Sequence, residues 1–426
     1  MSKLDAIATL LVMAAVSGWL NHRYLKLPMA IGVMVLSLLG TIVLTVAGSF
    51  YLGPVNSARV ALEAFVRSID LHSVVMEGML SLLLFAGALH VDVRLLTSYR
   101  RQILGLAVLG TLASTFIVGY ASSFVLNSLG LELPFIYCLA FGALISPTDP
   151  IAVLGVLKAA KVPKAFETAI AGESLFNDGV AVVVMTLLLG VIDQGQHPST
   201  RDVLSLFGQE ALGGVAFGAV LGVVCYQMLR SIDDYQVEVL ITLATVMGGY
   251  ALAHSLHVSG PLAMVVCGLI VGEYGRSSAM SDTTRKHLDT FWELLDTVLN
   301  AVLFLLIGVE IVVLQFAPPI GIAGALAIVI TLGARLLTVG LPVALLPGWF
   351  RLPKGSAKVL TWCGVRGGVS VALALSLPPG PQAETVVVLT YIVVVFSIIV
   401  QGLTVSRVAR MALGDGAASE PAGGAH

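Results

Sequence analysis

Long apolar runs separated by short polar segments cover almost the whole chain. A helix that crosses about 30 Å of hydrocarbon needs about 20 largely apolar residues, and a window of that length finds thirteen such runs. They lie near 4–21, 28–47, 71–91, 103–128, 133–157, 166–192, 204–229, 236–256, 260–274, 289–313, 319–346, 357–377 and 384–406. The pattern therefore predicts an all-α polytopic membrane protein with about thirteen transmembrane helices.

Basic residues in the connecting segments predict the orientation of the chain. With the spans threaded in order, 17 of the 23 Lys and Arg residues fall on one side, and only Lys3, Arg59, Arg67 and Arg201 fall on the other. Connections rich in Lys and Arg stay in the cytoplasm. We therefore expect the N-terminus outside and the C-terminus in the cytoplasm, with the chain in the cell (inner) membrane.

Composition agrees with this class and excludes others. The chain has 57% hydrophobic and 11% charged residues and a net charge of −2, whereas soluble domains carry about 25% charged residues. There is no concentrated basic face for nucleic acid. The four cysteines lie in apolar runs without metal-binding spacing, so we expect reduced core residues and no cofactor.

One apolar run contains polar side chains that lipid penalises. Glu173-Ser174-Leu175-Phe176-Asn177-Asp178 lies near the start of the run between Ala169 and Ile192. A carboxylate at bilayer depth costs roughly 3 kcal/mol on insertion scales. On a helix, Glu173 and Asn177 share one face, and Ser174 and Asp178 share the adjoining face. Two carboxyls, an amide and a hydroxyl within one turn and a half predict a membrane transport site.

Two other runs carry residues that interrupt helices. The fifth contains Ser146-Pro147-Thr148-Asp149-Pro150, whose prolines remove backbone donors and disfavour helix at the residues before them. A simple proline kink is the alternative, but it leaves Asp149 unexplained. The twelfth contains Gly364-Val365-Arg366-Gly367-Gly368, in which each glycine weakens the helix by about 1 kcal/mol. One break in each half predicts inverted repeats with two discontinuous helices that cross at the site.

These features predict competition between a proton and a cation. Ser174 and Asp178 are expected to face the first break, where Asp149 and a freed carbonyl near Thr148 add further hard oxygen ligands. Burial disfavours the charged form of a carboxyl group, so H⁺ and a monovalent cation compete for the same oxygens. Exchange follows if the site faces one side of the membrane at a time.

Other buried polar residues have supporting roles in this interpretation. Arg335 is expected to pair with Glu173, which turns with Asn177 toward another helix. Arg366 is expected to neutralise carbonyl groups at the second break, with a solvated helix end as the alternative. Asp296 and Glu310 are expected near helix ends, with a position in a cavity as the alternative. A further list, Gly214, Gly218 and Gly222, has the four-residue spacing of a close-packing helix face.

The sequence resembles the monovalent cation:proton antiporter family, which includes the bacterial NhaP-type sodium/proton antiporters and the animal sodium/proton exchangers. The resemblance lies in the two breaks, in Gly172-Glu173-Ser174-Leu175-Phe176-Asn177-Asp178-Gly179 and in Leu84-Phe85-Ala86-Gly87-Ala88-Leu89-His90. It covers the chain from about Leu10 to Arg410. A departure is Ala86, where the family more often has an acidic residue.

The resemblance implies a fold and a division of labour. It implies thirteen helices in a membrane transporter domain over 1–410, followed by a short cytoplasmic tail over 411–426. Within this domain it implies a core part near 100–192 and 319–410 and a dimerisation part near 1–95 and 204–313. It implies that Thr148, Asp149, Ser174 and Asp178 bind the ion, that Asp178 is shared with the proton, and that Arg335 holds Glu173 beside Asn177. The Asn177-Asp178 pair is similar to that of electroneutral one-for-one exchangers, and a homodimer is expected.

Three other readings remain open at this point. A potassium/proton antiporter differs only in the ion that it takes. A cation channel needs a continuous path and usually a repeated filter element, which the sequence lacks. An intramembrane aspartyl protease resembles its relatives in a Gly-x-Gly-Asp signature, whereas the one Gly-Asp pair here is Gly414-Asp415 in the tail. We therefore expect a transporter for Na⁺ or Li⁺ and H⁺, and not an enzyme.

Overall fold

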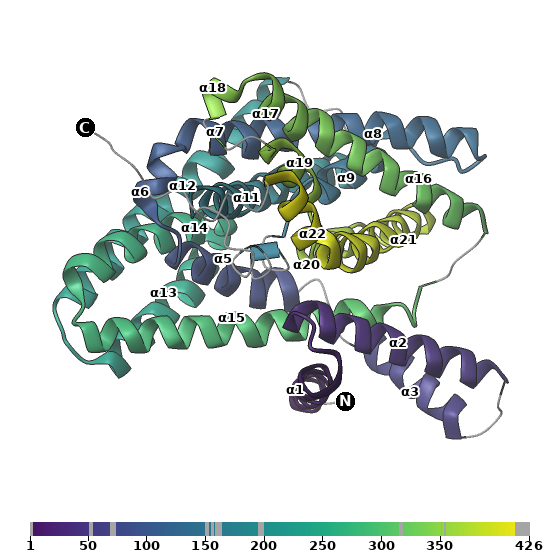
Figure 1. Ribbon diagram of the computed structural model, residues 1–426, viewed down its shortest axis with the longest axis horizontal. Helices are drawn as coiled ribbons and strands as arrows, with labels where there is room; N and C mark the ends of the chain where they lie inside the picture. The colour runs from purple at the N-terminus through teal and green to yellow at the C-terminus, as the bar shows by residue number, and fades with distance from the viewer. Residues whose placement is uncertain are drawn as a thin grey trace.

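The fold is a bundle of helices, seen in a computed structural model (Figure 1). The structure describes residues 3–50, 54–68, 74–149, 153–154, 157, 164–194, 200–314, 318–350, 352 and 355–413. Within these ranges all regular secondary structure is helical. The all-α prediction is therefore confirmed for the described part of the chain.

The helices follow one another with short connections. The first half contains α1 (Lys3–Leu20), α2 (Met29–Phe50), α3 (Pro54–Ser68), α5 (Leu80–Leu89), α6 (Val93–Ser98), α7 (Arg100–Leu104), α8 (Thr111–Ser128), α9 (Phe135–Ile145) and α11 (Lys164–Gln194). The second half contains α12 (Thr200–Arg230), α13 (Tyr235–Ser255), α14 (Gly260–Ile270), α15 (Asp282–Glu310), α16 (Pro318–Arg335), α17 (Leu341–Leu345), α18 (Pro347–Phe350), α19 (Ser356–Trp362), α20 (Gly368–Leu375), α21 (Pro381–Phe396) and α22 (Gly402–Leu413). Short π-helical segments lie at Asn21–Leu25, Val74–Met79, Gly105–Gly110, Val271–Ala279, Leu336–Gly340 and Ser397–Gln401.

Eight helical stretches in the described residues are long and apolar enough to cross a membrane. Three shorter apolar stretches, Val74–Leu89, Phe135–Ile145 and Gly260–Gly275, accompany them. Each of the thirteen predicted ranges overlaps a described helix. The number that crosses the membrane stays a prediction. Residues 150–152 of the fifth range and the tail from residue 414 lie outside the described residues.

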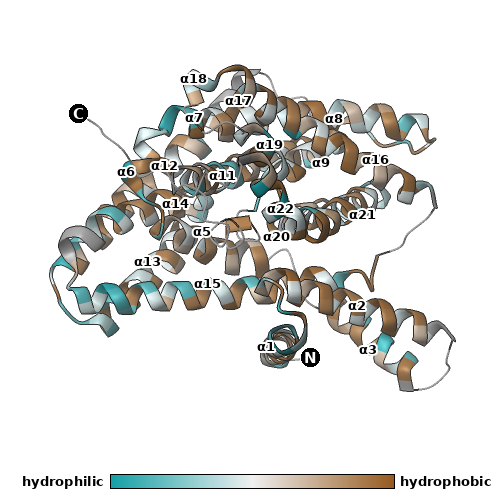
Figure 2. Ribbon diagram, in the orientation of Figure 1, coloured by the Kyte–Doolittle hydropathy of each residue, from teal (hydrophilic) through white to brown (hydrophobic). Residues whose placement is uncertain are grey.

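Apolar side chains cover the outside of the bundle, while polar side chains lie within it. Phe124 and Leu212 are 76% and 72% exposed, whereas Glu173 is 2% exposed. Figure 2 shows hydrophobic residues along most helices and hydrophilic residues at the end of α15 that begins at Asp282. This distribution suits a protein whose outer surface meets lipid.

The long helix α12 and the shorter helix α14 approach closely through glycine. A Cβ on Gly218 of α12 would lie 2.4 Å from the carbonyl oxygen of Ala263 in α14, and one on Gly214 would lie 2.7 Å from that of Ser259. No other residue leaves room for such an approach, so the predicted close-packing face is confirmed. Ser259 also caps α14, because its hydroxyl accepts from the Leu262 amide.

The helices pack in two sets of neighbours. In one set α8 contacts α9 and α16, and α16 contacts α21; in the other α14 contacts α12 and α5, and α15 contacts α2. α11 and α20 also contact α5 and α15 respectively, so they lie between these sets. The division into a core part and a dimerisation part remains a prediction.

Candidate functional site

The two predicted breaks meet at the centre of the bundle. α9 ends at Ile145, and α19 and α20 are separated by residues 363–367. The Asp149 amide donates to the Val365 carbonyl oxygen at 2.7 Å. The unwound backbone of one break therefore forms a hydrogen bond with that of the other. This bond satisfies polar groups that would otherwise be unpaired in the membrane. The two breaks therefore lie against each other, as predicted.

Arg366 fixes the first break from within the second. Its side chain is 2% exposed, and its Nη1 donates to the carbonyl oxygens of Ser146 at 2.6 Å and Pro147 at 3.0 Å. The sequence-based prediction that Arg366 serves the carbonyls of its own break was wrong. The carbonyl groups of the first break face the Arg366 guanidinium because the two unwound segments lie against each other. The sequence alone does not reveal this arrangement.

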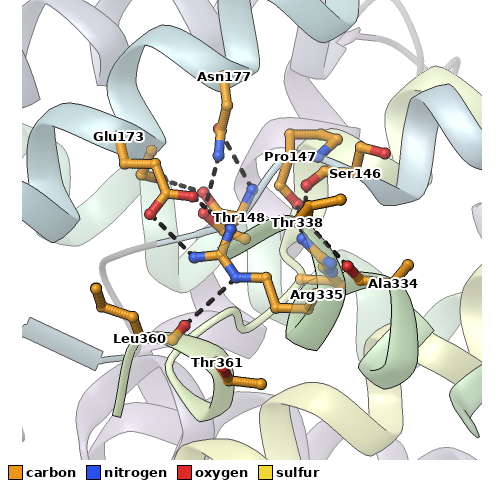
Figure 3. Close-up of polar contacts among 12 residues, drawn as sticks. Ser146, Pro147, Thr148, Glu173, Asn177, Ala334, Arg335, Thr338, Leu360 and Thr361 are labelled. Atoms are coloured by element: carbon orange, nitrogen blue, oxygen red, sulfur yellow. Dashed lines mark hydrogen bonds and ion pairs between the residues drawn. The ribbon is translucent and has the colours of Figure 1, made fainter. Parts of the chain in front are cut away.

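Glu173 of α11 and Arg335 at the end of α16 form a buried ion pair, drawn in Figure 3. Arg335 Nη1 donates to Glu173 Oε1, and Nη2 donates to Oε2 at 3.0 Å. The guanidinium Nε also donates to the Leu360 carbonyl oxygen at 3.4 Å, just before the second break. The side chains of Glu173 and Arg335 are 2% and 9% exposed, respectively. The predicted pairing is confirmed, and it ties α11, α16 and α19 together.

Thr148 is held by the helix opposite the break. Ser174 Oγ donates to the Thr148 carbonyl oxygen. Asn177 Nδ2 donates to Thr148 Oγ1 at 3.0 Å, and the Thr148 amide donates to Asn177 Oδ1 at 3.4 Å (Figure 3). Ser174 faces the break as predicted. Asn177 also faces the break, so the prediction that it turns with Glu173 toward another helix was wrong. The amide, with a donor and an acceptor, matches the backbone and hydroxyl that the open segment offers.

Asp149 and Asp178 line a cavity of about 550 Å³, together with Thr148 and Ser174. Asp178 is 9% exposed, and its side chain lines the same cavity as that of Asp149. Gly367 leaves room for Asp149, because a Cβ there would lie 2.2 Å from Asp149 Oδ2. The structure thus brings together all four residues expected to bind the ion.

The donor set is one of hard oxygens. Two carboxylates, a hydroxyl and a carbonyl suit a cation such as Na⁺ or Li⁺ better than a soft transition metal. No group of three His, Cys, Asp or Glu side chains that could hold a metal ion occurs among the described residues. The four cysteines, Cys138, Cys225, Cys267 and Cys363, are buried and reduced.

The cavity also contains residues that the sequence analysis assigned elsewhere or missed. Asp296 lies in the middle of α15 and lines the cavity, so its expected place at a helix end was wrong. Glu310 is the last residue of that helix, as expected. Asn300 and Ser370 were missed, although Asn300 follows Asp296 by one helical turn and so shares its face. Ala86 lines the same cavity.

Comparison with known proteins decides the family. The sodium/hydrogen exchanger transmembrane family matches residues 11–411. The Na(+)/H(+) antiporter NhaP of Pseudomonas aeruginosa is 49% identical over 418 residues, which cover 96% of this chain and 96% of that protein. The chain belongs to the sodium/hydrogen exchanger family.

Other members of the exchanger family extend this relationship. The Na(+)/H(+) antiporter NhaH of Halobacillus aidingensis is 39% identical over 320 residues, or 74% of this chain and 76% of that protein. The structure of the sodium proton antiporter MjNhaP1 from Methanocaldococcus jannaschii matches 97% of this chain and 100% of its own with a TM-score of 0.76 and 20% identity. This exchanger fold and the family expected from the motifs are confirmed.

Proposed function

We propose that this protein is a secondary active antiporter that exchanges Na⁺ or Li⁺ for H⁺ by alternating access. The observation that carries the proposal is the convergence of Asp178, Asp149, Ser174 and Thr148 at one end of a cavity, where the two unwound segments cross. The full-length similarity to a relative named as a Na(+)/H(+) antiporter supports it. The relatives are transporters and not enzymes.

Each polar residue then has a defined task. Asp178 takes either a proton or a cation, because its carboxyl oxygens cannot hold both. Asp149, Ser174 and Thr148 complete the ligand set. Arg335 pairs with Glu173 and holds it in place. Asn177 orients the open segment at Thr148, and Arg366 binds the carbonyl oxygens of Ser146 and Pro147 at the first break. These are proposals for roles, resting on the contacts of each side chain.

Electroneutral one-for-one exchange follows from the charges on α11. Glu173 is paired with Arg335, and Asn177 is neutral, so among the polar residues that α11 brings to the site only Asp178 has a carboxyl group that is free to exchange its proton. One carboxyl releases one H⁺ for each monovalent cation that it binds. Exchange should therefore proceed equally well with and without a membrane potential.

The proposal is tested in proteoliposomes that contain the purified protein and an imposed pH gradient. Adding NaCl or LiCl should dissipate the gradient, and Asp178→Asn should abolish this effect. At lower pH more Na⁺ should be needed for half-maximal rate, with the maximal rate recovered at high Na⁺, because protons occupy Asp178. Cation flux that is insensitive to pH would instead show a channel.

The same assay with KCl separates the potassium/proton alternative, since the oxygen ligands do not by themselves select Na⁺ over K⁺. Dissipation by K⁺ but not by Na⁺ or Li⁺ would replace the sodium proposal. A valinomycin-clamped potential that changes the rate would contradict one-for-one stoichiometry.

Orientation, location and assembly are part of the proposal. The asymmetry of Lys and Arg places the C-terminus in the cytoplasm of the cell (inner) membrane. A homodimer formed through the part near 1–95 and 204–313 rests on the resemblance to the antiporter family, and Val12 of α1 and Leu212 of α12 are exposed side chains within that part. Cross-linking of single-cysteine variants at these two positions in native membranes tests the dimer.

A further inference from the structure

The second break lacks a backbone hydrogen bond that a continuous helix would have there. In an α-helix each amide donates to the carbonyl oxygen four residues before it, so the Arg366 amide would donate to the Trp362 carbonyl oxygen. Instead α19 ends at Trp362 and α20 begins at Gly368, with unwound backbone between them. A buried amide or carbonyl group without a partner is costly. Both groups therefore need partners from elsewhere in the molecule.

Two residues of the C-terminal helical stretch supply these partners. α21 continues through the π-helical turn Ser397–Gln401 into α22, which contacts α19. The Arg366 amide donates to Ser397 Oγ at 2.8 Å. Gln401 Nε2 donates to the Trp362 carbonyl oxygen at 3.0 Å, and Gln401 Oε1 accepts from Ser397 Oγ at 2.7 Å. The two side chains thus form a bridge that replaces both halves of the missing backbone hydrogen bond.

The bridge consists of buried polar groups that match an open helix. Ser397 is 1% exposed and Gln401 is 3% exposed. The hydroxyl and the amide each use a donor and an acceptor. If the break closed into a helix, the Arg366 amide would pair with the Trp362 carbonyl oxygen, and Gln401 Nε2 would lose its acceptor. A buried donor without an acceptor is unfavourable, so the bridge stabilises the open form.

The bridged segment is also the segment that contacts the ion site. The Val365 carbonyl oxygen, between the two bridged residues, accepts from the Asp149 amide at 2.7 Å. Gly367, the next residue after Arg366, leaves room for the Asp149 carboxyl group. A bridge that fixes the backbone on both sides of Val365 therefore fixes the position of Asp149.

We propose that Ser397 and Gln401 are positioning residues for cation exchange, because they hold the second break open in the geometry that places Asp149 at the cavity. Neither residue lines that cavity, so they act through the backbone of residues 362–366. The inference rests on the proposed antiport, in which Asp149 is a cation ligand. Loss of the bridge weakens cation binding and leaves the Asp178 carboxyl group in place.

Transport kinetics in proteoliposomes test the bridge. Ser397→Ala removes the acceptor of the Arg366 amide and should raise the KM for Na⁺ roughly 5-fold, the scale of one hydrogen bond. The maximal rate should be almost unchanged, since cation binding precedes the exchange step. Gln401→Met should act in the same direction. The double variant should raise KM by less than the product of the two single effects, because the two side chains form one unit.

The matched control is Thr390→Val in α21. It removes a hydroxyl that is 0% exposed and donates to the Val386 carbonyl oxygen of its own helix, so it should leave KM unchanged. A KM in Ser397→Ala equal to that of the control, or a fall in maximal rate alone, would overturn the proposal.

The pH profile distinguishes positioning from a general loss of structure. Protons and Na⁺ compete for Asp178 in the proposed exchange, so at a fixed Na⁺ concentration the rate falls on the acid side. Weaker Na⁺ binding lets protons displace the cation at a lower proton concentration. The half-maximal rate of Ser397→Ala should therefore move to higher pH, whereas a poorly folded variant loses rate at every pH without this shift. An unshifted profile contradicts a positioning role.

Hydrogen–deuterium exchange measures the break without transport. In purified protein, peptides that span residues 362–367 should exchange faster in Ser397→Ala than in the wild type or in Thr390→Val, because the Arg366 amide loses its acceptor. Equal exchange in all three would refute the bridge. Failure of Na⁺ to dissipate the pH gradient with the wild-type protein would instead refute the proposed antiport, and the exchange experiment separates these two results.

Discussion

At the scale of single residues, the pair of Glu173 and Arg335 shows how a buried charge is kept without being transported. Both side chains are almost fully removed from solvent and are joined by two hydrogen bonds. An arginine remains protonated under all ordinary conditions, and the Glu173 carboxyl group faces this fixed positive charge. The pair is therefore a fixed element of structure, whereas Asp178, one turn further along α11, faces the cavity.

Removing one partner of this pair should be far more harmful than removing both. Glu173→Gln leaves the Arg335 charge buried, and we expect it to lower the free energy of unfolding by about 3–5 kcal/mol. Thermal denaturation of the purified protein in detergent measures this. Glu132→Gln, which neutralises an exposed carboxylate, is the control and should change little.

The double replacement Glu173→Met with Arg335→Met distinguishes a charge effect from a loss of packing. An apolar pair of similar volume removes both desolvation costs, so most of the stability should return. If the double variant is as unstable as Glu173→Gln, packing around these side chains, and not their charge, holds the three helices together.

Some of these residue contacts could be predicted from the sequence and others could not. Glu173 was assigned to Arg335 because few other charges lie deep in apolar runs, which leaves each with few partners. The orientation of Asn177 and the target of Arg366 depend on where unwound backbone lies in space. Helical periodicity gives no information about that, so both predictions failed.

At the scale of elements, the crossing of the two unwound segments depends on the smallest side chain at one position. Gly367 has an extended backbone with φ −122° and ψ −163°, which any residue adopts. Its requirement is for space, because a Cβ would lie 2.2 Å from Asp149 Oδ2 and 2.5 Å from Asp149 Cβ. The glycine allows a carboxylate of one break to lie against the backbone of the other.

Gly367→Ala should therefore displace Asp149 and reduce cation-dependent exchange at least 10-fold, as expected when a reacting group is misplaced by about 1 Å. Gly333→Ala in α16 is the matched control, since no atom lies within 4 Å of its added Cβ. It should keep full activity and gain up to about 1 kcal/mol from helix propensity. Equal activity of the two variants in the proteoliposome assay would show that the close approach has no role in exchange.

The elements themselves were largely predictable, and the exceptions have physical causes. Long apolar runs without proline became α12 and α13 near their predicted bounds. α15 begins at Asp282, seven residues before its predicted start, because its first turns are polar and a hydropathy window excludes them. Because the predicted helix began too late, Asp296 fell near its start in the sequence analysis. In the structure Asp296 lies in the middle of α15 and lines the cavity.

At the scale of the whole molecule, the cavity gives access to the site from one side. Its exposed lining residues include Glu293 and Thr297 of α15 and His90 after α5. In the orientation proposed above from the distribution of Lys and Arg, the start of α15 and the end of α5 face the cytoplasm. The structure would then correspond to a state in which Asp178 communicates with the cytoplasm.

Cysteine labelling tests this orientation. Thr297→Cys should react with a membrane-impermeant maleimide in inside-out vesicles and remain unlabelled in right-side-out vesicles. Glu132→Cys, in the exposed connection between α8 and α9, should show the opposite pattern. The native cysteines are buried, so the unmodified protein is the background control. Labelling of Thr297→Cys from the outside alone would invert the proposed topology.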